Sequence, residues 1–115
     1  MEHLVNKINK ENADFIFIMG DLVHFTSDEI IPYLNILNQL RATYGVFSIM
    51  GNHDYSRYAH FNTESDRLKD VEQNINFQQQ MGWQILCNES CKISIDSIGN
   101  SITIAGLEYW SPAKP

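Results

Sequence analysis

The chain has 115 residues, which is enough for one small domain with a modest hydrophobic core but not for two domains. Its formal net charge is -6, from 8 Lys and Arg against 14 Asp and Glu residues. This balance argues against a protein that neutralises nucleic-acid phosphates with a basic face. The longest apolar run is far shorter than a membrane span, and the polar, helix-like start is unlike a signal peptide.

The first half of the chain has the pattern of a βαβ unit. After a short amphipathic helix at the start, the unbroken apolar run over 14–19 predicts a strand that is buried on both faces. Thr26 and Glu29 have capping-box spacing and predict the start of a helix with Pro32 in its first turn. A second apolar strand is expected over 46–50. The expected inward stripe of the intervening helix is Ile30, Leu34, Leu37 and Leu40.

The second half predicts one long helix followed by short strands. The helix is expected over about 64–81, with Leu68, Val71 and Ile75 facing inward and Gly82 ending it. Strands are expected over 85–87, 92–98 and 101–107, and Gly99–Asn100 reads as a two-residue hairpin turn. Cys87 and Cys91 fit neither a disulfide framework nor a zinc pair; we interpret them as ordinary thiols near a turn, in preference to a disulfide across it.

Two loops that follow the apolar strands are rich in candidate metal ligands. The first is Gly20-Asp21-Leu22-Val23-His24 and the second is Gly51-Asn52-His53-Asp54-Tyr55. Because ligands of an open parallel sheet bind beyond the carboxyl ends of its strands, we expect Asp21 and Asn52 to stand at the same edge of the sheet.

The residue types in these loops suit metal and phosphate chemistry. The two oxygens of the Asp21 carboxylate can bridge two cations, and the Asn52 carbonyl oxygen is a neutral ligand. His53 is expected to contact a phosphate or to donate a proton, with Asp54 holding its other ring nitrogen and raising its pKa. The alternative is that Gly-Asp and Gly-Asn-His-Asp are turns with a purely structural role. For His24 in particular, a role in stabilising its loop explains the residue equally well.

Gly-Asp-Leu-Val-His and Gly-Asn-His-Asp-Tyr, about thirty residues apart, resemble the second and third signature motifs of the calcineurin-like metallophosphoesterases. The stretches 42–55 and 104–108 are similar to a bacterial subgroup of membrane-associated phosphohydrolases. The resemblance implies an α/β fold, here a partial metallophosphatase-type sandwich with a βαβ unit and C-terminal hairpin strands over 1–115. It also implies that Asp21 bridges two metals, that Asn52 binds the second metal, that His53 lies near the phosphate and that Asp54 is its partner.

Other motifs of that family have no counterpart in the sequence. The family also uses an Asp-x-His before the first helix, a later lone His and a Gly-His-x-His near the end, and His3 and His60 do not fall in matching contexts. The sequence therefore predicts a truncated piece of a hydrolase that uses two divalent ions (manganese, iron or zinc), with the piece itself nearly inactive. The alternative is a non-catalytic scaffold module of the same fold; no glycine-rich nucleotide-binding pattern occurs.

The expected partner is a phosphate-containing substrate of unknown identity, and no nucleic acid is expected as a regulatory partner. The subgroup resemblance implies membrane association through an upstream segment. An uncovered strand edge or core surface would favour self-association of the piece. The compartment stays open.

Overall fold

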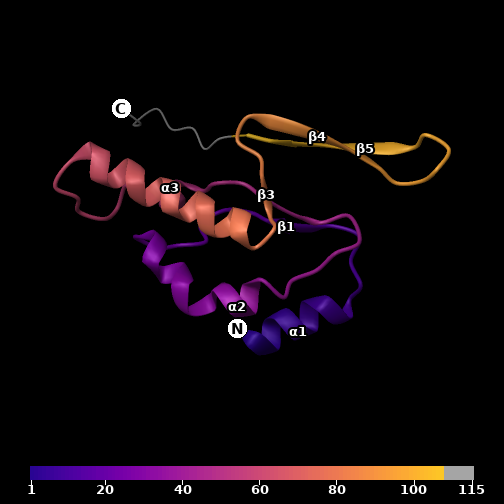
Figure 1. The fold of residues 1–115 in the computed structure, drawn as a ribbon, viewed down its shortest axis with the longest axis horizontal. Coiled ribbons are helices and arrows are strands. Elements are labelled where there is room, and N and C mark those ends of the chain that lie inside the picture. The colour runs from indigo at the N-terminus through magenta and orange to yellow at the C-terminus, as the bar shows by residue number, and fades with distance from the viewer. Residues whose placement is uncertain (108–115) are drawn as a thin grey trace.

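The structure, a computed structural model, describes residues 1–107. A three-stranded sheet, whose strands are connected through helices, is followed directly by a separate two-stranded hairpin (Figure 1). Along the chain the elements are α1 (Glu2–Lys10), β1 (Ile16–Ile18), the 3-10 helix η1 (Ser27–Tyr33), α2 (Leu34–Leu37), β2 (Val46–Ser48), the 3-10 helix η2 (Asn52–Tyr55), α3 (Glu64–Gln80), β3 (Gln84–Ile85), β4 (Glu89–Ser94) and β5 (Ser101–Gly106).

The central sheet is parallel, as the βαβ pattern predicts. Its strand order is β1-β2-β3, and the register aligns Ile16 with Val46 and Phe47 with Gln84. All three residues of β2 are buried, which is the expected state of a central strand covered on both faces. The α/β fold class expected from the sequence is confirmed.

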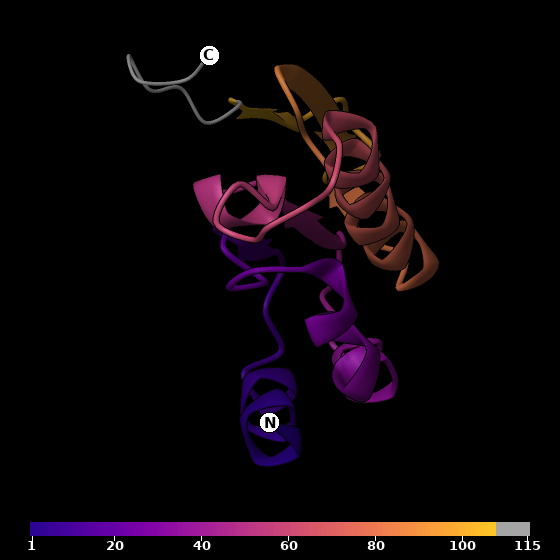
Figure 2. The same cartoon turned by 90° about the vertical axis from the view of Figure 1, so that its left-hand side faces the viewer.

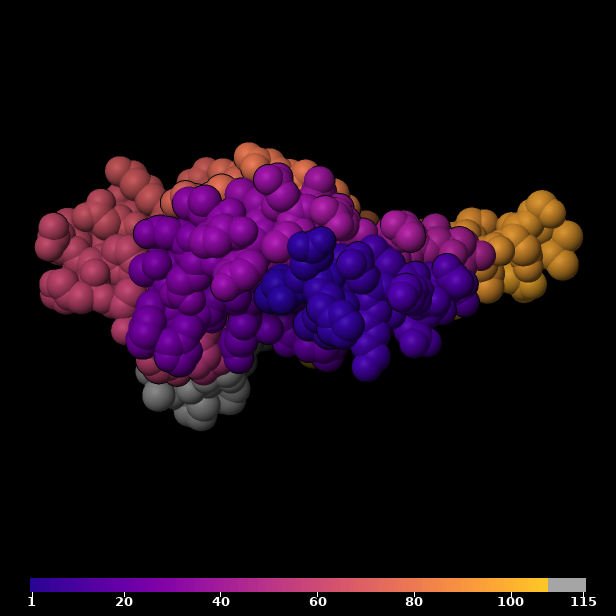
Figure 3. All heavy atoms as spheres, turned by 90° about the horizontal axis from the view of Figure 1, so that it is seen from below, coloured from indigo at the N-terminus to yellow at the C-terminus, as the bar shows by residue number. Residues whose placement is uncertain are grey.

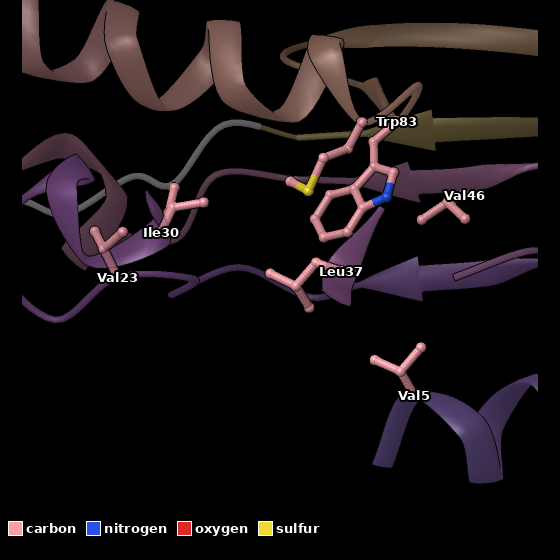
Figure 4. Close-up of a cluster of buried hydrophobic side chains, with 7 residues drawn as sticks. Val5, Val23, Ile30, Leu37, Val46 and Trp83 are labelled. Carbon is pink, nitrogen blue, oxygen red and sulfur yellow. The ribbon is translucent and has the colours of Figure 1, made fainter. Parts of the chain in front are cut away.

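The hydrophobic core lies between the sheet and the helices on one of its faces. Val5 of α1, Leu37 of α2 and Trp83 before β3 are all buried and point toward one another (Figure 4). Val23, Ile30, Val46 and Met81 complete the cluster. Alternate side chains of β1 and β2 point to the other face of the sheet. On that face Phe17 is half exposed, and its ring packs beside the ring of Phe47.

The hairpin lies against that second face. Tyr44 donates a hydrogen bond from its hydroxyl to the carbonyl of Ile95 at 3.1 Å, and Gly106 at the end of β5 lies directly on Leu86. In Figure 1, α1 and α2 lie below the sheet and the hairpin lies above it. Figure 2 shows the same layers from the side, and in Figure 3 the hairpin projects past the helices at one end of the molecule. The molecule is accordingly elongated, with extents of 52 × 32 × 21 Å.

Three local expectations were wrong. Pro32 lies inside η1, so the predicted regular helix is a 3-10 helix with only four α-helical residues after it. Proline lacks the N–H and crowds the preceding turn, which explains the break. On α3, Leu68 is exposed, whereas Asn74 and Gln78 are buried. The hairpin turn is longer than two residues, because Ser94 pairs with Ser101.

Asp96 organises that longer hairpin loop. Its Oδ1 accepts hydrogen bonds from the N–H groups of Ile98 and Asn100, each over 3.0 Å. The Asn100 side-chain amide donates to Oδ2 over 2.6 Å. Carboxylates that bond the backbone two residues ahead stabilise turns, so the loop has its own internal support.

Candidate metal and phosphate site

The two predicted loops meet at the carboxyl ends of β1 and β2. The last ladder bond between them runs from the N–H of Ile49 to the carbonyl of Ile18 over 3.1 Å. Beyond it the glycines touch: a β-carbon on Gly20 would lie 2.8 Å from the backbone nitrogen of Gly51, and one on Gly51 would lie 2.3 Å from Oδ1 of Asp21. Only glycine at both positions allows the loops to approach this closely.

Asp21 has an unusual backbone conformation and an exposed side chain. Its φ is 55°, a left-handed value that Asp adopts more readily than most residues. The Oδ1 atom accepts a hydrogen bond from the backbone N–H of His53 over 3.0 Å. Within residues 1–107 the other carboxylate oxygen has no recorded hydrogen bond, and the residue is exposed at the rim where the loops meet.

Asn52 begins η2 beside Asp21. Its side-chain nitrogen donates to the hydroxyl of Tyr58 over 3.0 Å. Because the nitrogen makes this bond, the carbonyl oxygen of the same amide is the atom left for another partner, and oxygen is the end of an amide that a cation binds. The structure thus brings the two predicted ligand residues, Asp21 and Asn52, to the same rim of the sheet.

The His53 imidazole has a different partner from the one expected. Its Nδ1 lies 2.8 Å from the carbonyl oxygen of His24, and its ring stacks on the His24 ring with centroids 5.1 Å apart. Tyr58 contacts the ring as well, at a centroid distance of 4.4 Å. The prediction that Asp54 holds the second nitrogen of His53 is wrong, because the backbone of the first loop fills that position.

Asp54 is buried and ties the two loops together. Its Oδ1 accepts from the N–H of Val23 over 3.1 Å, and its Oδ2 accepts from the N–H of Gly51 over 2.9 Å. Burial raises the pKa of the Asp54 carboxyl above its ordinary value, although the surrounding backbone N–H groups favour the charged form. With its side chain fully covered, Asp54 stabilises the loop geometry; a direct role in the reaction stays a prediction.

Two further carboxylates support the first loop. Glu29 accepts hydrogen bonds from the N–H groups of His24, Phe25 and Thr26 over 2.7 to 2.8 Å. The capping-box spacing identified Glu29, but nothing in the spacing shows that it also fixes the backbone of His24.

Asp70 of α3 was not recognised from the sequence. It accepts from the hydroxyls of Ser27 (2.6 Å) and Ser56 (2.5 Å), so it joins α3 to the segments that follow both loops. Because Asp70 lies on a helix far from the motifs in sequence, only the three-dimensional structure reveals this link.

The oxygen donors at this rim fit part of a shell for a divalent cation. An exposed carboxylate and an amide carbonyl are both ligands that such ions accept in proteins. Within residues 1–107, no group of three or more His, Cys, Asp and Glu side chains is arranged to hold a metal ion. Asp21 and Asn52 therefore fit as two members of a larger ligand set. No helix in the same range is long and apolar enough to cross a membrane.

The Gly-Asp and Gly-Asn-His-Asp loops thus meet at the carboxyl edge of a parallel sheet. The chain belongs to the calcineurin-like phosphoesterase family, whose sequence pattern matches residues 1–112. A Campylobacter jejuni protein named uncharacterized metallophosphoesterase is 28% identical over 108 residues, and one from Bacillus subtilis is 27% identical over 112 residues. A third, from Helicobacter pylori, is 34% identical over 55 residues, or 48% of this chain.

These relatives are much longer than the chain. The match covers 94% of this chain but 26% of the Campylobacter protein, and 96% of this chain but 37% of the Bacillus protein. The Helicobacter match covers 15% of that protein. No solved structure matches the chain.

Proposed function

We propose that the protein to which this chain belongs hydrolyses a phosphomonoester, a phosphodiester or a pyrophosphate at a dinuclear divalent metal centre. The observation that carries this proposal is the contact between the two loops, in which Asp21 accepts from the N–H of the residue after Asn52. In a chain of the calcineurin-like phosphoesterase family, this contact between the two loops supports a metal site that Asp21 and Asn52 share.

Each residue of the rim has a distinct task in this proposal. Asp21 would help to hold both cations through its carboxylate, and Asn52 would help to hold one through its amide oxygen. His53, whose Nδ1 faces a carbonyl, directs Nε2 toward the phosphate or the leaving oxygen. The two cations, when bound, would provide a nucleophile at neutral pH and offset the charge of the phosphoryl oxygens.

The 115-residue chain by itself is expected to have little activity. The described residues supply two oxygen ligands at the rim, and metal affinity depends on the number and geometry of ligands. The same reasoning leaves the substrate open, because nothing at the rim distinguishes a monoester from a diester.

The test compares the full-length protein with the isolated chain in hydrolysis of bis-p-nitrophenyl phosphate with added manganese. We expect metal-dependent turnover by the full-length protein only. Asp21→Asn and Asn52→Ala should each lower kcat/KM by at least about 100-fold, the upper end of what loss of a metal ligand's hydrogen-bond partner causes.

Matched controls come from exposed side chains elsewhere. Asp14→Asn and Asn76→Ala remove the same chemical groups far from the rim and should leave kcat/KM unchanged. If the full-length protein binds no manganese and turns over no phosphate ester, the catalytic proposal fails and a scaffold role for this fold takes its place.

A further inference from the structure

Tyr58 contacts Asn52 and His53, the two residues of the second loop to which the proposed function assigns a direct role. Its hydroxyl accepts the hydrogen bond from the Asn52 amide over 3.0 Å, and its ring lies 4.4 Å from the His53 ring between centroids, tilted by 31°. A single residue thus lies against a proposed metal ligand and a proposed phosphate contact at once.

The hydrogen bond to Tyr58 engages the nitrogen end of the Asn52 amide. A side-chain amide has a nitrogen that only donates and an oxygen that only accepts, and rotation about its last bond exchanges them. Only the oxygen can bind a cation. In the orientation that the structure shows, the nitrogen donates to the Tyr58 hydroxyl, which leaves the oxygen as the end of the amide that a cation could use.

Packing in the hydrophobic core does not explain the position of the Tyr58 side chain. The side chain is 54% exposed, so it contributes little to the hydrophobic core. The segment that carries it is nevertheless firmly anchored: Ser56 adopts a left-handed φ of 57° and donates to Asp70, and Arg67 donates to the carbonyl of Tyr55. These anchors turn the chain back after η2 and bring Tyr58 over Asn52 and His53.

We propose that Tyr58 is a positioning residue of the metal site: its hydroxyl orients the Asn52 amide oxygen for a divalent cation, and its ring holds the His53 imidazole. This inference rests on the proposed function, and it adds a residue outside the two loop motifs. Groups that orient metal ligands typically change metal affinity by roughly 10- to 100-fold when removed.

The experiment uses the full-length protein with Tyr58→Phe, which removes the hydroxyl and keeps the ring. In metal-free protein labelled with 15N-asparagine, we expect the Asn52 side-chain amide signals, assigned by their loss in Asn52→Ala, to move in Tyr58→Phe. Manganese binding, measured by titration calorimetry, should weaken by roughly 10-fold. Excess manganese should then restore most of kcat, because the lesion lies in affinity.

Two companion variants separate the hydroxyl from the ring. Tyr58→Leu removes both and should also lower kcat at saturating manganese, since His53 loses its ring contact. Tyr33→Phe removes a hydroxyl from another exposed tyrosine and should change neither the Asn52 signals nor the affinity.

The outcomes distinguish this inference from the proposed function. If wild type binds manganese and Asn52→Ala weakens that binding, while Tyr58→Phe leaves the amide signals or the affinity unchanged, the Tyr58 inference is overturned and the proposed function stands. If wild type binds no manganese, the proposed function is overturned, and the role of Tyr58 in orienting a metal ligand is overturned with it.

Discussion

The carboxylate of Asp21 accepts a hydrogen bond from the backbone N–H of His53 over 3.0 Å, although 32 positions separate the two residues. The same side chain is exposed at the rim where the proposed cations would bind. Asp21 therefore combines two tasks, because one oxygen binds the backbone of the second loop while the side chain is exposed to solvent. Replacement by Asn keeps an acceptor for the His53 N–H, whereas replacement by Ala would disturb the loop and the ligand together.

The close approach of the loops makes Gly51→Ala a severe change. A β-carbon at this position would lie 2.3 Å from Asp21 Oδ1 and 2.6 Å from its backbone nitrogen, so the loops must separate. We expect a loss of about 2 kcal/mol in the free energy of unfolding, as for other overpacked sites, together with loss of manganese binding. Urea denaturation and titration calorimetry measure the two effects.

Gly99→Ala is the control for that change. Gly99 has a φ of 97° in the hairpin loop, and an added β-carbon would meet no atom within 4 Å. The substitution should cost about 1 kcal/mol through backbone strain alone and leave manganese binding intact. Normal manganese affinity in Gly51→Ala would contradict the inference that contact between the loops sets the site geometry.

Asp54→Asn tests whether this buried carboxylate is structural. Both of its oxygens accept backbone hydrogen bonds, from Val23 and Gly51, and an Asn side chain has only one acceptor oxygen. One buried N–H would then face the new NH2 group, at a cost of about 2 kcal/mol in the free energy of unfolding. Asp14→Asn, on an exposed side chain, should cost almost nothing. An Asp54→Asn protein as stable as wild type but inactive would instead indicate a direct role in the chemistry.

The sheet and the meeting of the two loops were predictable because their signals are strong and local. Apolar runs that end in Gly-Asp and Gly-Asn mark strands and the loops beyond them, and parallel pairing then brings the loops to one edge. The inward face of α3 was not predictable in the same way. Asn74 and Gln78 are buried through hydrogen bonds: the Gln78 amide donates to Asn74 over 2.8 Å and accepts from the hydroxyl of Ser48. The periodicity of apolar residues instead predicted that Leu68 faces inward, and Leu68 is exposed.

Within the site, the residue types were predictable but their pairing was not. Asp54 is adjacent to His53 in the sequence, so an Asp–His pair was the natural hypothesis. The tight turn of η2 instead directs the Asp54 carboxylate back to the N–H of Gly51. Backbone carbonyls carry no signal in a sequence, and for this reason the contact between His53 and the carbonyl of His24 could only be found in three dimensions.

Glu29 gives the first loop a defined dependence on pH. Partial burial disfavours the charge of Glu29, but the N–H groups of Thr26, His24 and Phe25 outweigh it and hold its pKa below the ordinary 4.5. The folded state therefore binds fewer protons than the unfolded state near this pH. The stability that Glu29 contributes is present above pH 4.5 and is lost as the pH falls through the lower, folded value.

Glu29→Gln is expected to remove this contribution. At pH 7 the variant should be less stable than wild type by about 1 kcal/mol, similar to the loss of a helix cap, and the difference should shrink below pH 4.5. Urea denaturation at several pH values measures how the difference in stability changes with pH. The range from roughly pH 3 to 7 covers the titration of a carboxyl group. Glu72→Gln, at an exposed position of α3, is the control. A difference that grows on acidification would show that the sign of the effect is wrong.

The geometry around His53 predicts the position of its proton. Nδ1 lies 2.8 Å from the carbonyl oxygen of His24, and a carbonyl can only accept a hydrogen bond, so Nδ1 must carry the hydrogen in both the neutral and the cationic ring. In the neutral form Nε2 is then unprotonated. Long-range 1H–15N spectra of the metal-free protein above pH 8, which is roughly 1.5 units above the ordinary pKa of histidine, should show His53 as the Nδ1–H tautomer. His3, an exposed residue of α1, provides the comparison. A protonated Nε2 on neutral His53 would show that Nδ1 does not donate to the His24 carbonyl, and would place the imidazole of this loop in another orientation.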